Sequence, residues 1–275
     1  MRYPTPFALP LIAVSLLIST ILPMSADTHT ELREKSRSSE TVAAQDQADD
    51  GASPTPVPAV VLEVIELTNR ERLKAGLPAL KRQKNLQDSA TWLARDMADR
   101  RYFDHHDSTG RDLTARITGF KYNDFSTLGE NIAMGQHTAH EVVDGWMNSP
   151  GHRANILSRN FSEIGVGYVI AAGHGAQGYW VQDFGSRFDR CPVVINTDSV
   201  KTTSSRVKLS IHGDDWVEAM RFSNDGNKWT PWEEFKPLRD WSLESGSGRK
   251  TVYIQVRHEG RIERIDAAVL VDDGV

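Results

Sequence analysis

Residues 146–157, WMNSPGHRANIL, decide how the first half of this chain folds. Ser149 is a favoured residue just before a helix, and Pro150 suits the first helical position, so a short helix is expected to run to Ile156. A longer helix is predicted immediately before it, over residues 138–147, because apolar residues recur there at helical spacing. The stretch therefore predicts two consecutive helices.

Further helices are predicted on the N-terminal side of this stretch. One begins at Ala59 and ends before Gly76, and its apolar residues have a helical period. A second is expected to open at Asn85, with Asp88 three residues later as a variant of the capping box. A shorter helix is expected over residues 112–117.

Strands are predicted on the C-terminal side. Residues 164–170 and 179–184 are rich in β-branched and aromatic residues and flank a Gly-rich loop, which indicates a hairpin. Helices followed by late strands predict an α+β domain over residues 59–190. From residue 191 onward, short strand-like runs separated by turns such as residues 224–226 and 258–260 predict an all-β sandwich over residues 191–275.

The N-terminus is typical of an exported protein. Residues 7–22 are almost wholly apolar, follow Arg2, and precede the small residues at 25 and 26, which predicts a signal peptide over residues 1–26. An uncleaved anchor is the alternative, because Met24 is a poor residue three positions before the cut. Residues 27–58 are acidic and end in a proline-rich run, so they are expected to form a disordered linker.

Composition excludes some classes of function. The net charge is −5, and the linker contributes most of it, with seven acidic and three basic residues between Asp27 and Ala52. The remainder is close to neutral, so a nucleic-acid partner is not expected. The single cysteine, Cys191, excludes an intrachain disulfide and is expected to be a packing residue.

The histidines are concentrated in one region. Six of the nine lie between His105 and His174, near the acidic residues Glu130 and Glu141. Imidazole and carboxylate are natural ligands for zinc and similar divalent ions. Distance along the sequence does not by itself bring such residues together, and the chain has no HExxH motif.

Four segments in this order resemble the CAP superfamily, which includes cysteine-rich secretory proteins, insect venom antigens and plant pathogenesis-related proteins. The resemblance is to the SCP-like branch found in bacteria and covers about residues 60–186. The segments are YFDHHD at 102–107, GENIA at 129–133, HEVVDGW at 140–146 and SPGHR at 149–153. LTNRER at 67–72 with the following Gly76-Leu77, the longer run WMNSPGHRANIL at 146–157, and YWVQDFG at 179–185 belong to the same resemblance. The resemblance implies an α-β-α sandwich followed here by an all-β domain, which itself resembles Ig-like or fibronectin type III-like modules.

The resemblance also implies a site. Members of the family line a groove with two histidines and two glutamates, which correspond here to His105, Glu130, Glu141 and His152. These four are the expected ligands of a divalent metal ion, with zinc the ion expected from the ligand chemistry, and Glu130 and Glu141 are the candidate catalytic carboxylates. Each also has a structural alternative. His106 could replace His105, and Glu130 could cap a helix starting near Asn131. Glu141 suits the first turn of its helix, and His152 could serve only to satisfy local backbone groups.

The resemblance leaves the function open, because the family has no single shared activity. Three hypotheses follow. The groove binds an extracellular lipid, peptide or glycan; or the protein is a metal-assisted hydrolase of peptide or cell-wall substrates; or the β-sandwich adheres to a cell wall or matrix. Trp216, Trp229, Trp232 and Trp241 could form a carbohydrate platform, although aromatic residues at strand spacing more often serve packing. A serine nucleophile at Ser149 is disfavoured, because the chain has no GxSxG elbow.

Overall fold

The computed structural model describes residues 57–171, 177–188, 190–213 and 216–272. The predicted signal peptide and nearly all of the predicted linker lie outside these residues, as does His174. Among the described residues, none of the helices has the length and apolar character needed to cross a membrane.

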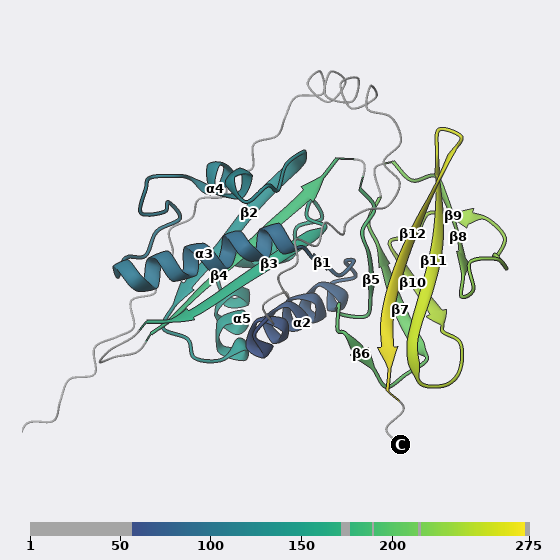
Figure 1. The fold of residues 1–275 in the computed structure, drawn as a ribbon, viewed down its shortest axis with the longest axis horizontal. Helices are drawn as coiled ribbons and strands as arrows, with labels where there is room; N and C mark the ends of the chain where they lie inside the picture. The colour runs from purple at the N-terminus through teal and green to yellow at the C-terminus, as the bar shows by residue number, and fades with distance from the viewer. Residues whose placement is uncertain (1–56, 172–176, 189, 214–215, 273–275) are drawn as a thin grey trace, which may run out of the picture.

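The first half of the described chain is a three-layer α-β-α sandwich (Figure 1). Its sheet has the strand order β1-β3-β4-β2. Strands β2, β4 and β3 pair antiparallel, whereas the short β1 pairs parallel with β3. The strands are β1 (Lys81–Arg82), β2 (Phe125–Met134), β3 (Glu163–Ile170) and β4 (Gly178–Arg187).

Helices cover both faces of this sheet. Helix α3 (Lys84–Arg100) packs along β3 and β4 on one face, with the short α4 (Leu113–Gly119) beside it. Helices α2 (Ala59–Lys74), α5 (Ala139–Asn148) and α6 (Pro150–Ile156) contact one another on the opposite face. Alternate side chains of β4 therefore enter different apolar cores. Trp180 and Phe184 pack with α2 and α5 on one face of the sheet, and Val181 packs with α3 on the other.

Two glycines let α3 lie very close to the sheet. A Cβ atom at Gly165 would collide with the backbone of Leu86 and Gln87, and one at Gly167 would collide with the backbone of Ala90. Only glycine therefore fits at these two positions, because the backbone of the helix lies so close to the strand.

The helices match the sequence predictions with two corrections. Helix α3 begins at Lys84 rather than Asn85, and its cap is Gln83, whose side chain accepts a hydrogen bond from the backbone N–H of Leu86. Asp88 does not close a capping box there; it pairs with Lys84 one turn earlier, at 2.6 Å. The second correction concerns Glu130, which lies in strand β2 and not at the start of a helix.

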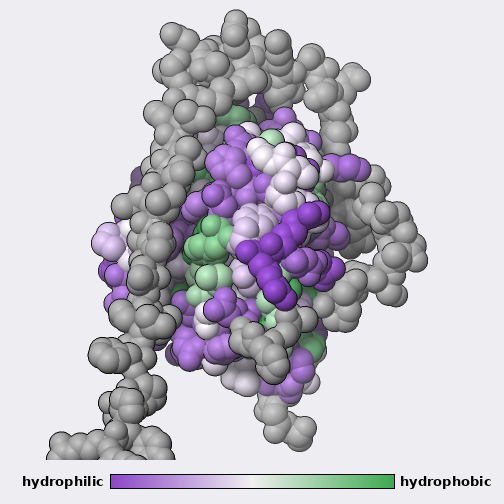
Figure 2. Space-filling model, turned by 90° about the vertical axis from the view of Figure 1, so that its left-hand side faces the viewer, coloured by the Kyte–Doolittle hydropathy of each residue, from purple (hydrophilic) through white to green (hydrophobic). Residues whose placement is uncertain are grey.

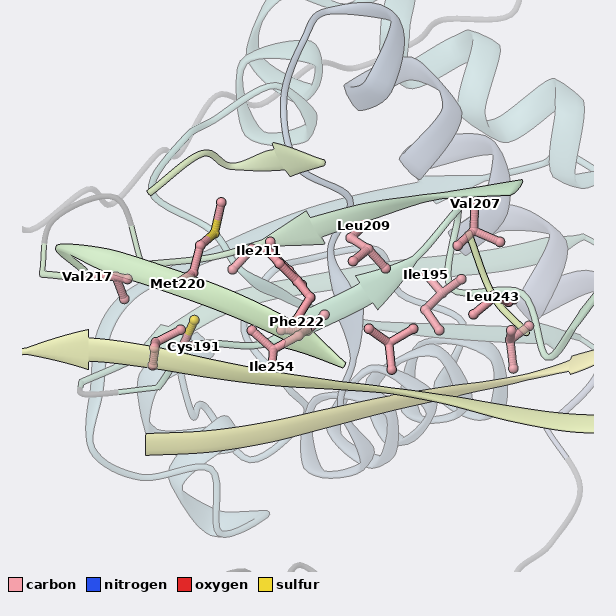
Figure 3. Close-up of a cluster of buried hydrophobic side chains, with 14 of the residues drawn as sticks. Cys191, Ile195, Val207, Leu209, Ile211, Val217, Met220, Phe222, Leu243 and Ile254 are labelled. Atoms are coloured by element: carbon pink, nitrogen blue, oxygen red, sulfur yellow. The ribbon is translucent and has the colours of Figure 1, made fainter. Parts of the chain in front are cut away.

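The second half of the described chain is all-β and has two sheets. A three-stranded sheet has the order β10-β7-β5, and a five-stranded sheet has the order β6-β12-β11-β8-β9. Their apolar side chains, with the buried Cys191, form one core (Figure 3). The strands are β5 (Val193–Ile195), β6 (Lys201–Thr202), β7 (Arg206–Ile211), β8 (Ala219–Ser223), β9 (Glu233–Glu234), β10 (Leu238–Ser242), β11 (Gly248–His258) and β12 (Arg261–Val271).

The predicted turn at residues 258–260 is confirmed. It joins β11 to β12 with two residues, Glu259 and Gly260, at φ values of 46° and 75°. Positive φ at both central positions suits the right-handed twist of a hairpin.

Polar contacts join the two halves. His212 lies buried with its Nε2 atom 2.7 Å from the carbonyl oxygen of Ala79, and the Ala79 N–H donates to the hydroxyl of Ser210 at 2.9 Å. The side chain of Asn69 donates to the Thr197 carbonyl at 3.1 Å. These bonds tie the end of the α2–β1 connection to the three-stranded sheet.

Candidate functional site

The loop that carries His105 follows the end of α3 and is held by two buried aspartates. Asp96 accepts hydrogen bonds from the hydroxyl of Tyr102, at 2.5 Å, and from the backbone N–H and hydroxyl of Ser108, both at 2.8 Å. Asp107 accepts hydrogen bonds from the backbone N–H and hydroxyl of Thr109 and from the backbone N–H and guanidinium of Arg111. Burial alone would raise the pKa of Asp107, but these hydrogen bonds outweigh it and lower the pKa to about 2. The loop conformation is therefore fixed by buried carboxylates.

His105 is oriented by Glu130. Its Nδ1 atom lies 2.7 Å from Oε1 of Glu130, and the two side chains are 17% and 3% exposed. A carboxylate only accepts hydrogen bonds, so Nδ1 carries the proton in this contact and Nε2 is the remaining ring nitrogen. The backbone carbonyl of His105 accepts a further bond from Arg116, at 3.1 Å.

Beneath His105 lies a buried group of three charged residues. Arg116, from α4, forms an ion pair with Oε2 of Glu130 and lies 3.5 Å from Asp183. Glu130 and Asp183 are directly opposite each other on β2 and β4. All three side chains are at most 3% exposed, so their charges interact strongly.

The two carboxyl groups of this group differ in pKa. Burial by itself raises the pKa of Glu130, but Arg116 and His105 outweigh it and hold the pKa below its usual value. Burial raises the pKa of Asp183 well above its usual value, and the nearby Glu130 adds to this effect. Arg116 therefore favours the ionised form of Glu130, and burial favours the protonated form of Asp183.

His152 lies near His105, on helix α6. Burial lowers its pKa, and the charge of His105 lowers it further. Asparagine side chains tie its helix to β2: Asn131 donates to the carbonyl of His152 at 3.2 Å, and Asn155 donates to the carbonyl of Glu130 at 3.1 Å. Asn155 therefore fixes the segment that carries His152, whereas Arg153 is exposed.

Glu141 lies at the start of α5 and closes a capping box. Its Oε2 atom accepts from the backbone N–H groups of His137, at 2.8 Å, and Thr138, at 3.1 Å, while its own N–H donates to the Thr138 hydroxyl. The first of these bonds is the main cause of its lowered pKa. The side chain is exposed, and its place in the first turn of the helix agrees with its structural alternative.

The remaining histidines of this region are peripheral. His106 is bound by Asp104 of its own loop, and His140 lies 3.8 Å from Glu63 with both side chains at least half exposed. Of the two neighbouring histidines, His105 is thus the one that contacts Glu130.

The structure brings His105 and Glu130 into contact and places His152 within electrostatic reach of His105. Among the described residues there is no ready-formed group of three or more His, Cys, Asp or Glu side chains that could hold a metal ion. The joint coordination of a metal by His105, Glu130, Glu141 and His152 stays a prediction.

Sequence reasoning missed two members of the buried group, Arg116 and Asp183. A signal for Asp183 exists, because it is the one charged residue in the otherwise apolar and amide run of residues 179–184. Strand alternation alone does not reveal that Asp183 faces Glu130, because β2 itself has little regular alternation. Arg116 has no comparable signal, since basic residues are common in the last turn of a helix.

Comparison with known proteins identifies two relatives of this chain. The uncharacterised Bacillus subtilis protein YkwD is 39% identical over 166 residues, covering 60% of this chain and 62% of YkwD. The uncharacterised membrane protein YlbC of the same organism is 33% identical over 105 residues, 38% of this chain and 30% of YlbC. The chain thus spans less than two thirds of the length of either relative.

A solved structure and a family model also match. The structure is of an extracellular protein with an SCP domain from Bacillus anthracis, with 30% identity, a TM-score of 0.41, and coverage of 48% of this chain and 45% of that chain. The model of the CAP family, described as the cysteine-rich secretory protein family, matches residues 65–184. That range runs from α2 to β4 and contains His105, Glu130, Glu141 and His152. Residues 65–184 therefore form a CAP domain, of the cysteine-rich secretory protein family.

Proposed function

We propose that this is an exported protein whose CAP domain binds a divalent metal ion through His105 and His152 and thereby holds an extracellular ligand. The observation that carries the proposal is the bond between His105 Nδ1 and Glu130 Oε1. Metal-binding histidines commonly donate their second ring N–H to a carboxylate, which fixes the tautomer and raises the basicity of the other nitrogen.

The electrostatics of both histidines fit this role. Glu130 is kept ionised by Arg116, so it can accept the Nδ1 proton of His105. The lowered pKa of His152 keeps its ring neutral near neutral pH, and only a neutral imidazole can bind a metal. Zinc and similar borderline ions are the cations that imidazole suits, and when bound such an ion supplies a Lewis acid with open positions for a ligand.

A binding role fits better than hydrolysis. A hydrolase would need Glu130 or Glu141 to accept a proton, yet both have a lowered pKa. Glu130 is also occupied by Arg116 and His105, and Glu141 by backbone N–H groups. Figure 2 views the end of the molecule formed by this domain, where a hydrophobic area is bordered by hydrophilic side chains and could contact an apolar part of a ligand.

Export is supported by the sequence and by the family. The apolar segment at residues 7–22 has the pattern of a signal peptide, and the matching family is described as secretory. The mature protein is then expected to begin near Asp27. Intact-mass analysis of protein from the native host tests this, and a cytosolic form that retains Met1 would contradict it.

Zinc titration calorimetry tests the metal site. Wild-type protein is expected to bind zinc chloride, and His105→Ala or His152→Ala should each weaken binding at least tenfold, because each removes one ligand. The matched controls are His106→Ala and His140→Ala, which remove exposed imidazoles and should stay within twofold of wild type. Equal affinity in wild type and the His105→Ala/His152→Ala double variant would remove the metal from the proposal.

A further inference from the structure

The outer face of the five-stranded sheet carries a row of arginines. Strand register places Arg221 of β8 and Arg264 of β12 on either side of Gln255, the β11 residue with which both are paired. Adjacent strands are ~4.8 Å apart, so the backbones of the two arginines are ~10 Å apart. Arg249 and Arg257 occupy the same face of β11, because they alternate in step with Gln255.

Aromatic rings organise these arginines. The guanidinium of Arg221 lies over two indole rings, 5.2 Å from the centroid of Trp229 and 4.6 Å from that of Trp232. Arg257 lies 5.2 Å from the Trp232 ring, and Arg264 lies 4.4 Å from the ring of Tyr253. Stacking orders a guanidinium while its N–H groups stay directed outward, which prepares it to bind an anion.

Within the part of the chain that the structure describes, these arginines have no ion-pair partner. Among the described residues, no carboxylate lies within ion-pair distance of Arg221, Arg249, Arg257 or Arg264, although many other arginines have such a partner. Arg239, for comparison, binds Glu233 at 2.8 Å. By register the carboxylates on this face are Asp266 and Glu234, so arginines outnumber them two to one.

The apolar side chains of the face do not form a patch. Ile262 and Leu270 are 55% and 38% exposed, and both lie on the outer side of β12. They are eight residues apart along the strand, which is ~26 Å. Apolar residues scattered in this way do not suit insertion into a membrane.

We propose that this outer face binds an acidic polysaccharide, a glycan chain whose sugars carry carboxylates. A planar guanidinium holds a carboxylate through two parallel hydrogen bonds, and several arginines spread across three strands match a polymer with repeated anionic groups. The edges of Trp229, Trp232 and Tyr253 offer apolar contact for sugar rings between the charges. This site is independent of the metal site proposed for the CAP domain.

Binding of the full-length protein to polygalacturonate tests the proposal, with neutral dextran and phosphatidylglycerol vesicles as comparison ligands. Wild type is expected to bind polygalacturonate and not dextran, and more weakly as salt is raised. Arg257→Gln/Arg264→Gln should lower the affinity at least tenfold; both residues are exposed, so the fold should be retained. The corresponding double lysine variant keeps the charges without the planar fork and should bind with intermediate affinity.

Two controls separate this surface from other effects. Arg70→Gln/Arg206→Gln removes two exposed arginines elsewhere and should stay within twofold of wild type. His105→Ala/His152→Ala should also bind the glycan normally, so failure of the metal proposal would leave this one intact. The proposal is overturned if wild type does not bind polygalacturonate, if the control arginine variant loses as much affinity, or if arginine-dependent binding is found with the vesicles alone.

Discussion

The two domains bury polar side chains to different extents. In the CAP domain the buried set includes the ionisable side chains of Arg72, Arg116, Glu130, Glu163 and Asp183. In the described part of the second domain, the buried polar residues are Ser210, His212 and Ser223. The second domain is thus held mainly by apolar packing, whereas the first surrounds its site with paired charges.

The difference indicates that the buried charges of the CAP domain serve to position side chains more than to stabilise the fold. A buried ion pair often contributes no more than an apolar replacement of the same shape, but removing one partner leaves an uncompensated charge. The Arg116–Glu130 pair lies directly beneath His105 and fixes both its ring and its backbone. Among its described residues, the β-sandwich core has no such buried charge pair, and the side chains that form it are apolar.

The largest effect is expected for Arg116→Met. The substitution leaves Glu130 ionised and buried without its main partner, which should destabilise the CAP domain by about 3–5 kcal/mol. Urea unfolding followed by circular dichroism measures the change. The control is Arg70→Met, which breaks an exposed helical pair with Glu66 and should cost at most about 1 kcal/mol. Equal losses in the two variants would show that burial does not raise the cost of breaking a charge pair in this domain.

The buried histidine between the domains predicts a pH dependence. Burial lowers the pKa of His212 to about 4, and the charge of Arg72 contributes to the lowering. The unfolded chain titrates near 6.5 and so takes up a proton that the folded protein excludes, which means that stability falls as pH drops from about 6.5 toward 4. The free energy of unfolding should fall by about 2 kcal/mol between pH 7 and pH 5 from this residue alone.

Urea midpoints at several pH values test this contribution. In His212→Gln the amide can still donate to the Ala79 carbonyl but does not titrate, so the decline over this range should be shallower than in wild type. Parallel declines in the two proteins would assign the pH dependence to other groups.

A conservative substitution in the apolar core of the β-sandwich is expected to destabilise the protein less than Arg116→Met. Ile254 is fully buried among apolar side chains, so Ile254→Val removes one methylene and leaves no polar group without a partner. The expected loss is about 1 kcal/mol, measured by thermal unfolding. A loss as large as that of Arg116→Met would mean that the β-sandwich is packed under tighter constraints than its apolar composition indicates.

The elements with strong periodicity were predictable from sequence. Helices α2 and α5, the hairpin of β3 and β4, and the turn at Glu259 and Gly260 follow from local patterns. Strand β2 was missed because the residues FSTLGENIAM show no clear alternation, and its one neighbour in the sheet, β4, is distant in sequence. Strand β1 has two residues and is defined by parallel pairing with the distant β3, which no local pattern indicates.

The site was predictable in part. Residue types and the family resemblance indicated His105, Glu130 and His152, and the structure shows a contact between the first two. Arg116 and Asp183 depend on long-range packing, because α4 and β4 meet beside β2 only in the folded domain. Glu141 carries two opposing signals, a family position and a capping-box position, and sequence alone does not choose between them.

The smallest expected effects are those of two variants that test whether Glu141 caps helix α5 or binds a metal. Thr138→Ala removes the hydroxyl that caps α5 and should destabilise the domain by about 1 kcal/mol without changing zinc affinity. Glu141→Gln keeps a side-chain oxygen that can accept from the N–H groups of His137 and Thr138 but removes the negative charge. If Glu141 acts as a cap, this variant should retain wild-type zinc affinity by calorimetry and nearly wild-type thermal stability. If the carboxylate is a metal ligand, zinc affinity should fall at least tenfold while stability without zinc is unchanged. The pair of variants therefore separates a carboxylate that serves the helix from one that serves the site.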